Sequence, residues 1–530
     1  MNNKTRFRKI ALLYSTILHL KTIQIRYRIY YYIRRKLKCI TKRIVHKKIF
    51  NGICKSLNLL PSIINYTSYY PERSFEFLNI KHHFQYNIDW ELSKYSKLWT
   101  YNLNYFEFLS QKDMSIEYGV RIIDEFIISI ENNSTGFEPY PLSLRIMNWI
   151  KFIIYHQINP EKYKNIIWTQ LQCLTKQKEY HLLGNHLLEN GFAFLFGAYY
   201  FNDARMYDQA KNILLKELDE QILDDGAHFE LSPMYHSLMS YRVMDCYNLV
   251  LCNDLFDKEL KIFLKEKAEL MLSFSQKISY QNGDIPLMND AANGIAPSNE
   301  ELFSYAGSLG LIVRESKLSQ SGYRKLTNEN FDLCFDVGEV GPTYQPGHAH
   351  ADTLSFELHI HNRPVIVDTG TSTYEVNEIR FYERSTAAHN TVSINGENSS
   401  EVWAGHRVGK RALTKITEDS DSCVIASHDG YFKRFGVNHN RCIRLNETEV
   451  LIEDNVTKGE AVANFHFHPD EEIQIFGNEV RGKDFVLTFE KALSLKLITS
   501  HYSPKFNVRI DNKSLEVAFN ENLITRIRLI

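Results

Sequence analysis

The sequence predicts an α-helical domain followed by an antiparallel β domain, because the spacing of apolar residues changes once along the chain. From about residue 85 to 325, apolar residues recur at three- and four-residue spacing, as on one face of a helix. From about residue 331, apolar and polar residues alternate, as in a half-buried strand. Helices first and strands afterwards are typical of separate α and β domains.

The helical pattern is clearest around residue 126, where apolar residues repeat on one face: Ile122, Ile123, Phe126, Ile127 and Ile130. Such segments recur about every 40 to 50 residues without a clear sequence repeat. We therefore expect stacked helical hairpins rather than a strict solenoid.

The alternating pattern is clearest between Leu354 and Ile360, where every second residue is apolar. A turn at 362–364 and a short apolar run at 365–367 follow. Similar short strands separated by turn residues are expected to the end of the chain.

Length and composition exclude several classes of protein. A chain of 530 residues is too long for one compact core and predicts two or three domains. Apolar residues make up 44%, and no window holds 18 uninterrupted apolar residues, which excludes a multi-spanning membrane protein. The eight cysteines include no CxxC pair, so neither a disulfide framework nor a thiolate zinc site is indicated. Buried free thiols are the simplest interpretation, and they favour a reducing compartment.

Charge is distributed unevenly along the chain. Residues 1–71 carry sixteen Lys and Arg and no Asp or Glu, which leaves 46 basic against 63 acidic groups, a net charge of −17, on the rest. Near the start, charges flank an apolar run of the length of a signal-peptide core. That run has no small-residue cleavage site after it, so we do not interpret it as a signal peptide.

Two interpretations of the basic segment are equally open. Residues 21–48 interleave Lys and Arg with Ile, Tyr and Leu, as does a helix that lies on anionic lipid, and this predicts contact with a membrane surface through residues 1–50. The alternative is a basic helix packed against the acidic remainder of the chain. Nucleic-acid binding is not expected, because no groove-reading motif accompanies the charge.

Two polar clusters lie in the helical region. In the segment 181–191, one helix face presents Asn185 and His186, with Glu189 one turn later. An ordinary helix surface with a C-terminal cap explains that segment equally well. In the segment 224–237, glycine, proline and polar groups surround Tyr235, although a tyrosine is more often a core or interface residue.

Two further clusters lie in the sheet region. His348 and His350 are two residues apart, so a strand at this point would project both imidazoles from one face, about 7 Å apart. That spacing suits two ligands of one metal, or one ligand beside a catalytic imidazole. Asp368 ends an apolar strand and needs a partner there, and His389 precedes another strand.

His350, Asp368 and His389 together form a nitrogen and oxygen ligand set that zinc accepts. Ordinary histidines at strand ends are the alternative. A second His-x-His pair, His466 and His468, is interpreted as part of a sheet rather than as a site.

In its order of motifs the chain resembles the heparinase II/III superfamily, and the heparinase-III-like branch most. The matching segments are WTYNLNYFEFL (99–109), EPYPLSLRIMNWIKF (138–152), GNHLLENG (184–191), DGAHFELSPMYHS (225–237), NDAANG (289–294), GHAHADTLSFEL (347–358), VDTG (367–370) and RSTAAHNTV (384–392). The basic first seventy residues fall outside this resemblance.

The resemblance implies a fold and a domain division. Superfamily members are polysaccharide lyases with an incomplete (α/α) toroid followed by an antiparallel β-sandwich. We therefore expect a basic N-terminal segment at 1–71, a helical toroid at 72–328 and a β-sandwich at 329–530. A location in the cell envelope or periplasm is implied, although the missing signal peptide leaves the cytoplasm and the inner face of the membrane open.

The resemblance also implies residue roles. Tyr235 matches the tyrosine that acts as Brønsted acid and often base, and His348 matches the catalytic histidine. Asn185, with His186 beside it, matches the amide that contacts the substrate carboxylate. Three residues match the ligands of a structural divalent metal, for which zinc is expected: His350, Asp368 and His389.

The chemistry of β-elimination explains these residue types. Removal of the C5 hydrogen of a uronic acid requires hydrogen-bond donors that neutralise its carboxylate. Tyrosine has a pKa near 10, so Tyr235 acts as a base only if neighbouring positive charge lowers its pKa or His348 shares its proton. The reprotonated phenol then protonates the departing C4 oxygen. We further expect Arg145, Glu189 and Trp149 to contact the acidic polymer, with core packing as the alternative for Trp149.

Three functions are therefore considered. The first is a lyase that acts on an acidic, uronate-containing polysaccharide. The second is a non-catalytic glycan-binding or accessory protein of surface-polysaccharide biosynthesis. The third, a metal-dependent hydrolase, is less favoured because no glycosidase-like pair of carboxylates is evident.

Overall fold

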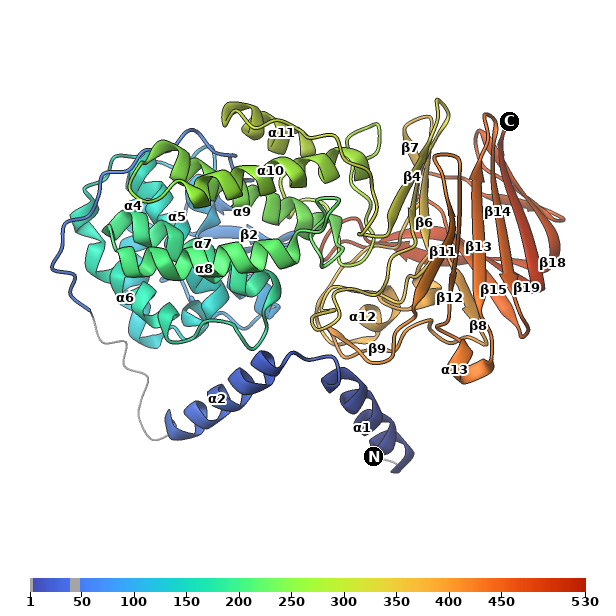
Figure 1. The fold of residues 1–530 in the computed structure, drawn as a ribbon, viewed down its shortest axis with the longest axis horizontal. Coiled ribbons are helices and arrows are strands. Elements are labelled where there is room, and N and C mark those ends of the chain that lie inside the picture. The colour runs from blue at the N-terminus through green and yellow to red at the C-terminus, as the bar shows by residue number, and fades with distance from the viewer. Residues whose placement is uncertain (1–2, 39–47) are drawn as a thin grey trace.

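The computed structural model describes residues 3–38 and 48–530 of the chain. Figure 1 shows a helical region on one side and a sheet region on the other, with two N-terminal helices beside both. Part of the segment expected to contact membrane, 1–2 and 39–47, lies outside the described residues. No helix in the described parts of the chain is long and apolar enough to cross a bilayer.

The N-terminal arm, as we call residues 3–38, consists of two helices, α1 (Asn3–Ile17) and α2 (Thr22–Lys38). Lys21, between them, forms an ion pair with Glu220 of the helical region. The arm therefore packs on the body, as one of the two interpretations predicts. The side of α2 that carries Gln24 faces the helical region.

The helical region opens with a small antiparallel sheet that the sequence pattern does not predict: β1 (Tyr69–Tyr70), β2 (Ser74–Phe77) and β3 (Ile80–His83). The α-helices that follow are α3 (Lys97–Tyr105), α4 (Ile116–Ser129), α5 (Pro139–Tyr155), α6 (Lys164–Thr175), α7 (Gly184–Phe201), α8 (Ala204–Gln221), α9 (Pro233–Cys252), α10 (Glu259–Ile278) and α11 (Asn299–Ser308). Short 3-10 turns join them at Glu107–Ser110, Ile130–Asn132, Thr135–Phe137 and Pro160–Lys162.

Hydrophobic spacing explains how these helices pack. In α4, Ile122, Ile123 and Phe126 are buried on one face, as the pattern predicts. By contrast, α7 is apolar on every side from Gly191 onward and almost every residue of the helix is buried, so it lies in the middle of the helical region. The toroidal arrangement of the helices stays a prediction.

The sheet region contains two main antiparallel sheets. The smaller is formed by β4 (Tyr323–Thr327), β5 (Phe331–Asp336), β6 (Phe356–Ile360) and β7 (Arg363–Ile366). The larger is formed by β8 (Val392–Ile394), β11 (Thr414–Asp419), β12 (Cys423–His428), β13 (His439–Leu445), β14 (Glu449–Val456), β15 (Ala461–His466), β16 (Gln474–Phe476), β17 (Glu479–Arg481), β18 (Phe485–Tyr502) and β19 (Ile510–Leu529).

One apolar core joins the two sheets, as in a sandwich. Phe335 and Leu358 of the smaller sheet belong to the same buried cluster as Ile452 and Phe465 of the larger one. The remaining elements lie in its loops: α12 (Glu378–Glu383), the 3-10 turn Thr386–Ala388, the hairpin of β9 (Val402–Trp403) with β10 (Arg407–Val408), and α13 (Phe432–Phe435). The predicted order, helices and then antiparallel strands, is confirmed.

Two details differ from the sequence-based expectation. The sheet region begins with β4 at Tyr323, a few residues before the expected boundary at 329. In addition, β6 begins only at Phe356, because the positive φ of Leu354 interrupts an extended backbone there. His348 and His350 therefore lie in the loop before the strand and not on one face of it. None of the cysteines in the described residues forms a disulfide.

Candidate active site

Tyr235 lies in the first turn of α9, where the sequence fixes the start of the helix. The side chain of Ser232 caps the helix by accepting a hydrogen bond from the backbone N–H of Tyr235 at 3.3 Å, and Pro233 occupies the first helical position. The Tyr235 hydroxyl lies 3.2 Å from that of Tyr374 in the sheet region. The phenol is therefore held where the two domains meet.

His348 reaches the same point from the loop between β5 and β6. Its imidazole stacks on the ring of Tyr235, with 3.8 Å between ring centroids and 27° between planes. Both side chains are partly exposed. The structure thus brings together the phenol and the imidazole that the sequence singles out, and their catalytic roles stay predictions.

Asp290 is the central residue that sequence reasoning missed. One carboxylate oxygen accepts a hydrogen bond from His348 Nδ1 at 3.0 Å, and the other lies 2.9 Å from His350 Nε2. Arg380, from α12, binds the same carboxylate with both terminal nitrogens, one of them at 2.8 Å. The NDAANG segment belongs to the motif set, but nothing in the sequence indicates that these three partners converge on its aspartate.

Electrostatics hold Asp290 ionised. Burial would raise the pKa of its carboxyl, but the charge of Arg380 and the hydrogen bonds from His348 and His350 together hold that pKa well below its usual range. Burial also lowers the pKa of His350 to about 3, so His350 is a neutral imidazole. A carboxylate at Nδ1 of His348 favours the tautomer that carries its proton there and leaves Nε2 as an acceptor.

Glu230 links His348 to the start of α7. One of its oxygens accepts the backbone N–H of Asn185 at 3.1 Å, and the other lies 3.4 Å from His348 Nε2. Burial raises the pKa of the Glu230 carboxyl. Leu183 and Gly184 both have positive φ, so the chain turns sharply before the helix and brings its N-terminus to Glu230.

Glu230 therefore links the backbone of Asn185 to His348, and His186 is the next residue of α7. Within the described part of the chain, the side-chain amide of Asn185 has no hydrogen-bond partner. His186 Nδ1 lies 3.1 Å from Glu179. Burial would lower the pKa of His186, but the charge of Glu179 outweighs it and the pKa is raised.

A pocket of about 810 Å³ opens next to this pair, between the helical and sheet regions. Tyr374, which bonds to Tyr235, forms part of its wall, and so does the exposed His406. Lys97 and Arg509 place cationic side chains in the same wall. The pocket wall therefore combines aromatic and basic groups with one carboxylate, that of Glu375.

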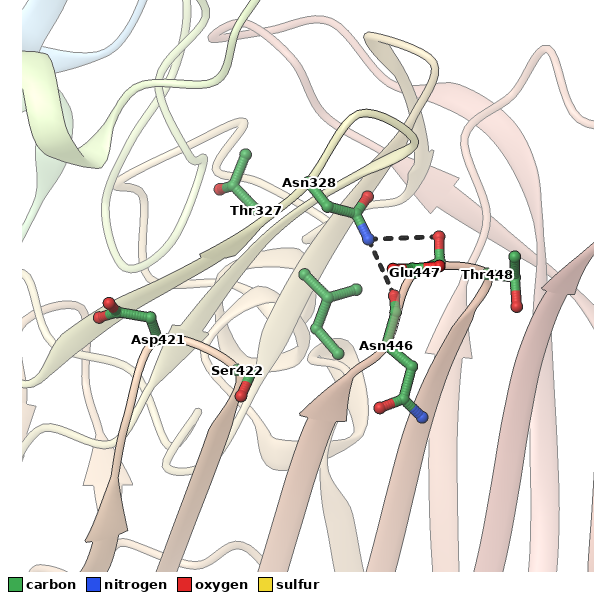
Figure 2. Close-up of a pocket in the computed structure, with 8 residues that line it drawn as sticks. Thr327, Asn328, Asp421, Ser422, Asn446, Glu447 and Thr448 are labelled. Atoms are coloured by element: carbon green, nitrogen blue, oxygen red, sulfur yellow. Dashed lines mark hydrogen bonds between the residues drawn. The ribbon is translucent and has the colours of Figure 1, made fainter.

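A second pocket, of about 570 Å³, lies at the turns of the sheet region and contains none of the predicted site residues. Figure 2 shows how Asn328 closes it, through hydrogen bonds to the backbone oxygens of Asn446 at 2.8 Å and Glu447 at 3.4 Å. These contacts join the β4–β5 turn to the β13–β14 turn, and we assign the pocket no function.

The three residues expected to contact substrate do not reach the cleft. Arg145 is fully buried, bonds Gln170 at 2.8 Å, and has its pKa lowered to about 9 by burial. Trp149 is also fully buried and packs edge-on against aromatic rings of the helical core. Glu189 is a buried partner of Arg242 at 3.3 Å. The expectation is wrong for these residues, because all three side chains are buried inside the helical region.

The expected metal ligands lie close together. His389 Nδ1 is 2.6 Å from Asp368, and the rings of His389 and His350 are 5.2 Å apart. Among the described residues, His350 Nδ1 and His389 Nε2 are buried and have no hydrogen-bond partner, so both nitrogens have the chemistry of a metal ligand. Among the residues with described positions, however, no group of three or more His, Cys, Asp or Glu is arranged to hold a metal. The metal therefore stays a prediction.

His466, from the second His-x-His pair, has an ordinary structural environment. Its Nδ1 lies 2.6 Å from Ser514 and its Nε2 lies 3.0 Å from the backbone oxygen of Ala387. Both nitrogens are thus engaged within the sheet region, and nothing draws this residue to the cleft.

Two protein-family models match consecutive parts of this chain. A model described as the heparinase II/III N-terminus matches residues 140–305, and one described as heparinase II/III-like, C-terminal, matches residues 314–529. Together they match more than half of the chain. The protein belongs to the heparinase II/III superfamily.

Curated relatives include two heparin-sulfate lyases. That of Bacteroides stercoris is 24% identical over 356 residues, which are 60% of this chain and 50% of the relative. That of Bacteroides thetaiotaomicron is 23% identical over 317 residues, which are 50% of this chain and 43% of the relative. The chain thus spans about half the length of the curated relatives it matches.

Solved structures agree on the fold. A crystal structure of heparinase III has a TM-score of 0.69 and 18% identity, covering 84% of this chain and 79% of that one. A heparan sulfate lyase from Pedobacter heparinus has a TM-score of 0.54 and 16% identity, covering 86% and 81%. These likenesses show a helical region followed by an antiparallel sheet region.

Proposed function

We propose that the protein is a polysaccharide lyase that cleaves an acidic, uronate-containing glycan by β-elimination. The observation that carries this proposal is the stacked pair of Tyr235 and His348 at the junction of the two domains, beside a pocket whose wall includes Lys97 and Arg509. The curated relatives, which are heparin-sulfate lyases, support a glycan of the heparan sulfate type as the first polymer to test.

The structure favours a division of roles between the two rings. Burial raises the pKa of Tyr235, so the resting phenol keeps its proton; the lowered pKa that a base would need is not found. Tyr235 is therefore assigned as the acid. His348 is assigned as the base, because its Nδ1 is anchored on Asp290 and Nε2 is left to accept a proton.

In the proposed reaction, His348 Nε2 removes the hydrogen on C5 of the uronate. The electron pair of that bond forms the C4–C5 double bond as the bond from C4 to its glycosidic oxygen breaks. The phenol of Tyr235 gives its proton to the departing oxygen, and the tyrosinate regains a proton from His348 or from water. Water adds to no sugar carbon, and the products are a 4,5-unsaturated sugar and a new chain end.

Charge develops on the uronate carboxylate during this step, and donors must be aimed at it. The Asn185 amide supplies a neutral donor. His186, whose pKa is raised by Glu179, supplies a donor that stays cationic to higher pH. Both lie at the N-terminus of α7, where backbone N–H groups also favour an anion.

The expected structural metal is part of the proposal. His350 Nδ1 and His389 Nε2 would supply nitrogen ligands and Asp368 an oxygen ligand, which suits zinc. Such an ion would tie together three loops of the sheet region that meet near Asp290, without taking part in the elimination.

The test is incubation of the full chain with a panel of uronate polymers, heparan sulfate first, while the ultraviolet absorbance of the unsaturated product is followed. We expect product with the unmodified protein and none with Tyr235→Phe. Tyr86→Phe, at an exposed position in the helical region, is the matched control and should retain full activity. Glycan binding that is identical in wild type and Tyr235→Phe, without product from either, would instead support a non-catalytic accessory protein.

A further inference from the structure

The inner face of α2 packs on the loop that leads to Asn185. Gln24 is completely buried and its amide donates to the backbone oxygen of Leu182 at 3.0 Å. Tyr31 donates to the backbone oxygen of Lys178 at 2.7 Å, and Tyr27 lies against Tyr180 with 4.8 Å between ring centroids. These residues repeat at helical spacing, so they define one face of α2.

The opposite face of α2 carries an uncovered apolar stripe. Ile25, Ile29, Tyr32 and Ile33 follow one another at four- and three-residue spacing, and they are 38% to 64% exposed. A helix that docks only on its own protein would place such residues inward. Here Gln24, Tyr27 and Tyr31 face the body, whereas Ile25, Ile29 and Ile33 face solvent.

The first helix repeats the arrangement. On α1, Phe7, Ile10, Tyr14 and Ile17 lie at three- and four-residue spacing and are 45% to 73% exposed. Figure 1 shows both helices on the same side of the molecule, α2 beside the helical region and α1 beside the sheet region. Each helix thus carries an exposed apolar stripe, and exposed apolar surface of this kind marks an interaction site.

The charge of this surface identifies the partner. Basic side chains border the stripes, and Lys9, Arg26, Arg35 and Lys36 are exposed. The first 71 residues contain no acidic residue, whereas the rest of the chain has an excess of acidic groups. A partner must therefore offer negative charge together with an apolar interior that accepts isoleucine and tyrosine.

We propose that the N-terminal arm docks the protein on an anionic lipid bilayer, with α1 and α2 lying in the headgroup region. Interfacial helices combine apolar residues with Lys, Arg and Tyr in this way, and negatively charged headgroups attract the cations. A second copy of the chain is disfavoured, because two arms would bring like charges together. An acidic glycan satisfies the charge but gives the isoleucines no apolar environment.

Docking of the arm would also orient the catalytic body. Thr16 at the end of α1 accepts a hydrogen bond from the indole of Trp403 at 3.1 Å, in the hairpin of β9 and β10. Lys21 bonds to Glu220 and lies 4.0 Å from the ring of Tyr344, which precedes His348 by four residues. Because the arm contacts both domains, a bilayer that binds it holds the cleft at a fixed height above the lipid.

The test is sedimentation of the full chain with vesicles of phosphatidylcholine alone and of phosphatidylcholine mixed with phosphatidylglycerol. We expect binding to the anionic vesicles only, weakened by salt because the attraction is screened. The triple variant Ile25→Glu, Ile29→Glu, Ile33→Glu should bind at least about tenfold more weakly. The matched control, Ile128→Glu with Ile262→Glu, alters exposed isoleucines outside the arm and should bind as wild type does.

Equal binding to neutral and anionic vesicles, or unchanged binding by the triple variant, would overturn the proposal. A wild-type dimer that the triple variant abolishes, without vesicle binding, would show that a second copy covers the stripe. Arm-dependent binding to heparin with no binding to vesicles would show a glycan partner instead. Activity on a soluble polymer should be equal in wild type and triple variant, so this proposal and the lyase proposal can fail separately.

Discussion

The proposed role of Tyr235 as the catalytic acid depends on its hydroxyl group. Replacing it by phenylalanine removes the hydroxyl that bonds to Tyr374 and leaves the stacked ring in place. We expect turnover to fall by at least about a hundredfold, since the acid is lost. Thermal unfolding should report a stability loss of only about 1 kcal/mol, the value of one hydrogen bond. A variant that retains half of wild-type activity would refute the assignment of Tyr235 as the acid.

Asp290 stabilises the site by charge as well as by position. In Asp290→Asn the side chain keeps its size, but Arg380 loses its buried counter-charge and His348 loses its anchor. We expect a destabilisation of about 3 to 5 kcal/mol, measured by urea unfolding, because an unpaired buried charge is costly. Arg380→Met in the same chain should recover part of this loss. If the double variant is no more stable than Asp290→Asn, the ion pair is not the cause.

His350 tests the expected metal. In His350→Ala we expect a lower melting temperature and less bound metal, measured by elemental mass spectrometry on protein purified with zinc present. His468→Ala, a histidine outside the proposed ligand set, should keep the wild-type metal content. Equal melting temperatures and equal metal content in wild type and His350→Ala would show that the ligand assignment is wrong.

At the scale of elements, the start of α9 connects helix capping to the site. Ser232 accepts the N–H of Tyr235 and donates to the backbone oxygen of Asp290 at 2.7 Å. Ser232→Ala should therefore lower the free energy of unfolding by about 1 to 2 kcal/mol and reduce turnover, since both Tyr235 and Asp290 lose a support. Ser232→Thr retains the hydroxyl and should recover most of both. Turnover unaffected by Ser232→Ala would separate the cap from catalysis.

The pairing of β13 with β14 contains a charge cluster that makes stability depend on pH. Asp454 binds His439 at 2.7 Å and Arg441 at 2.8 Å, and all three are fully buried. Burial would raise the pKa of Asp454, but the charge of Arg441 and the hydrogen bond from His439 lower it to about 2. A depressed carboxyl pKa stabilises the fold above the unfolded value of about 4, and the benefit is lost as pH falls toward 2.

We therefore expect wild type to lose up to about 2 kcal/mol more than Asp454→Asn as the pH falls from 5 toward 2. Urea unfolding at several pH values measures this difference. Asp511→Asn, at an exposed position, is the control and should follow the wild-type curve. Parallel curves for wild type and Asp454→Asn would show that Asp454 does not titrate in this range.

At the scale of the whole molecule, the site exists only because two domains meet. Tyr235 and Glu230 come from the helical region, and His348 and Tyr374 from the sheet region. The arm contacts both regions beside this junction. The proposed catalytic residues and the proposed membrane-binding arm therefore both depend on the junction between the helical and sheet regions.

The sequence by itself predicted those features that depend on short-range patterns of residues. Periods of about 3.6 and 2 residues report which side of a helix or strand is buried, so the order of α and β regions was predictable. The motifs identified Tyr235, His348 and Asn185 as candidates. Each of these residues lies within one short segment that can be recognised without knowing the rest of the fold.

Only the tertiary structure decided which residues share the cleft. Asp290 lies 58 residues from His348 and 90 from Arg380, and no periodicity relates such positions. The same limit explains the wrong expectation for Arg145, because a polar residue on a helix faces solvent or a neighbouring helix according to packing that the helix does not encode. It also explains the arm, where composition left lipid contact and packing on the body equally open, and where the structure places Gln24 on the body and leaves Ile25, Ile29 and Ile33 exposed. Long-range contacts are set by how whole elements pack, and that information is absent from any single window of sequence.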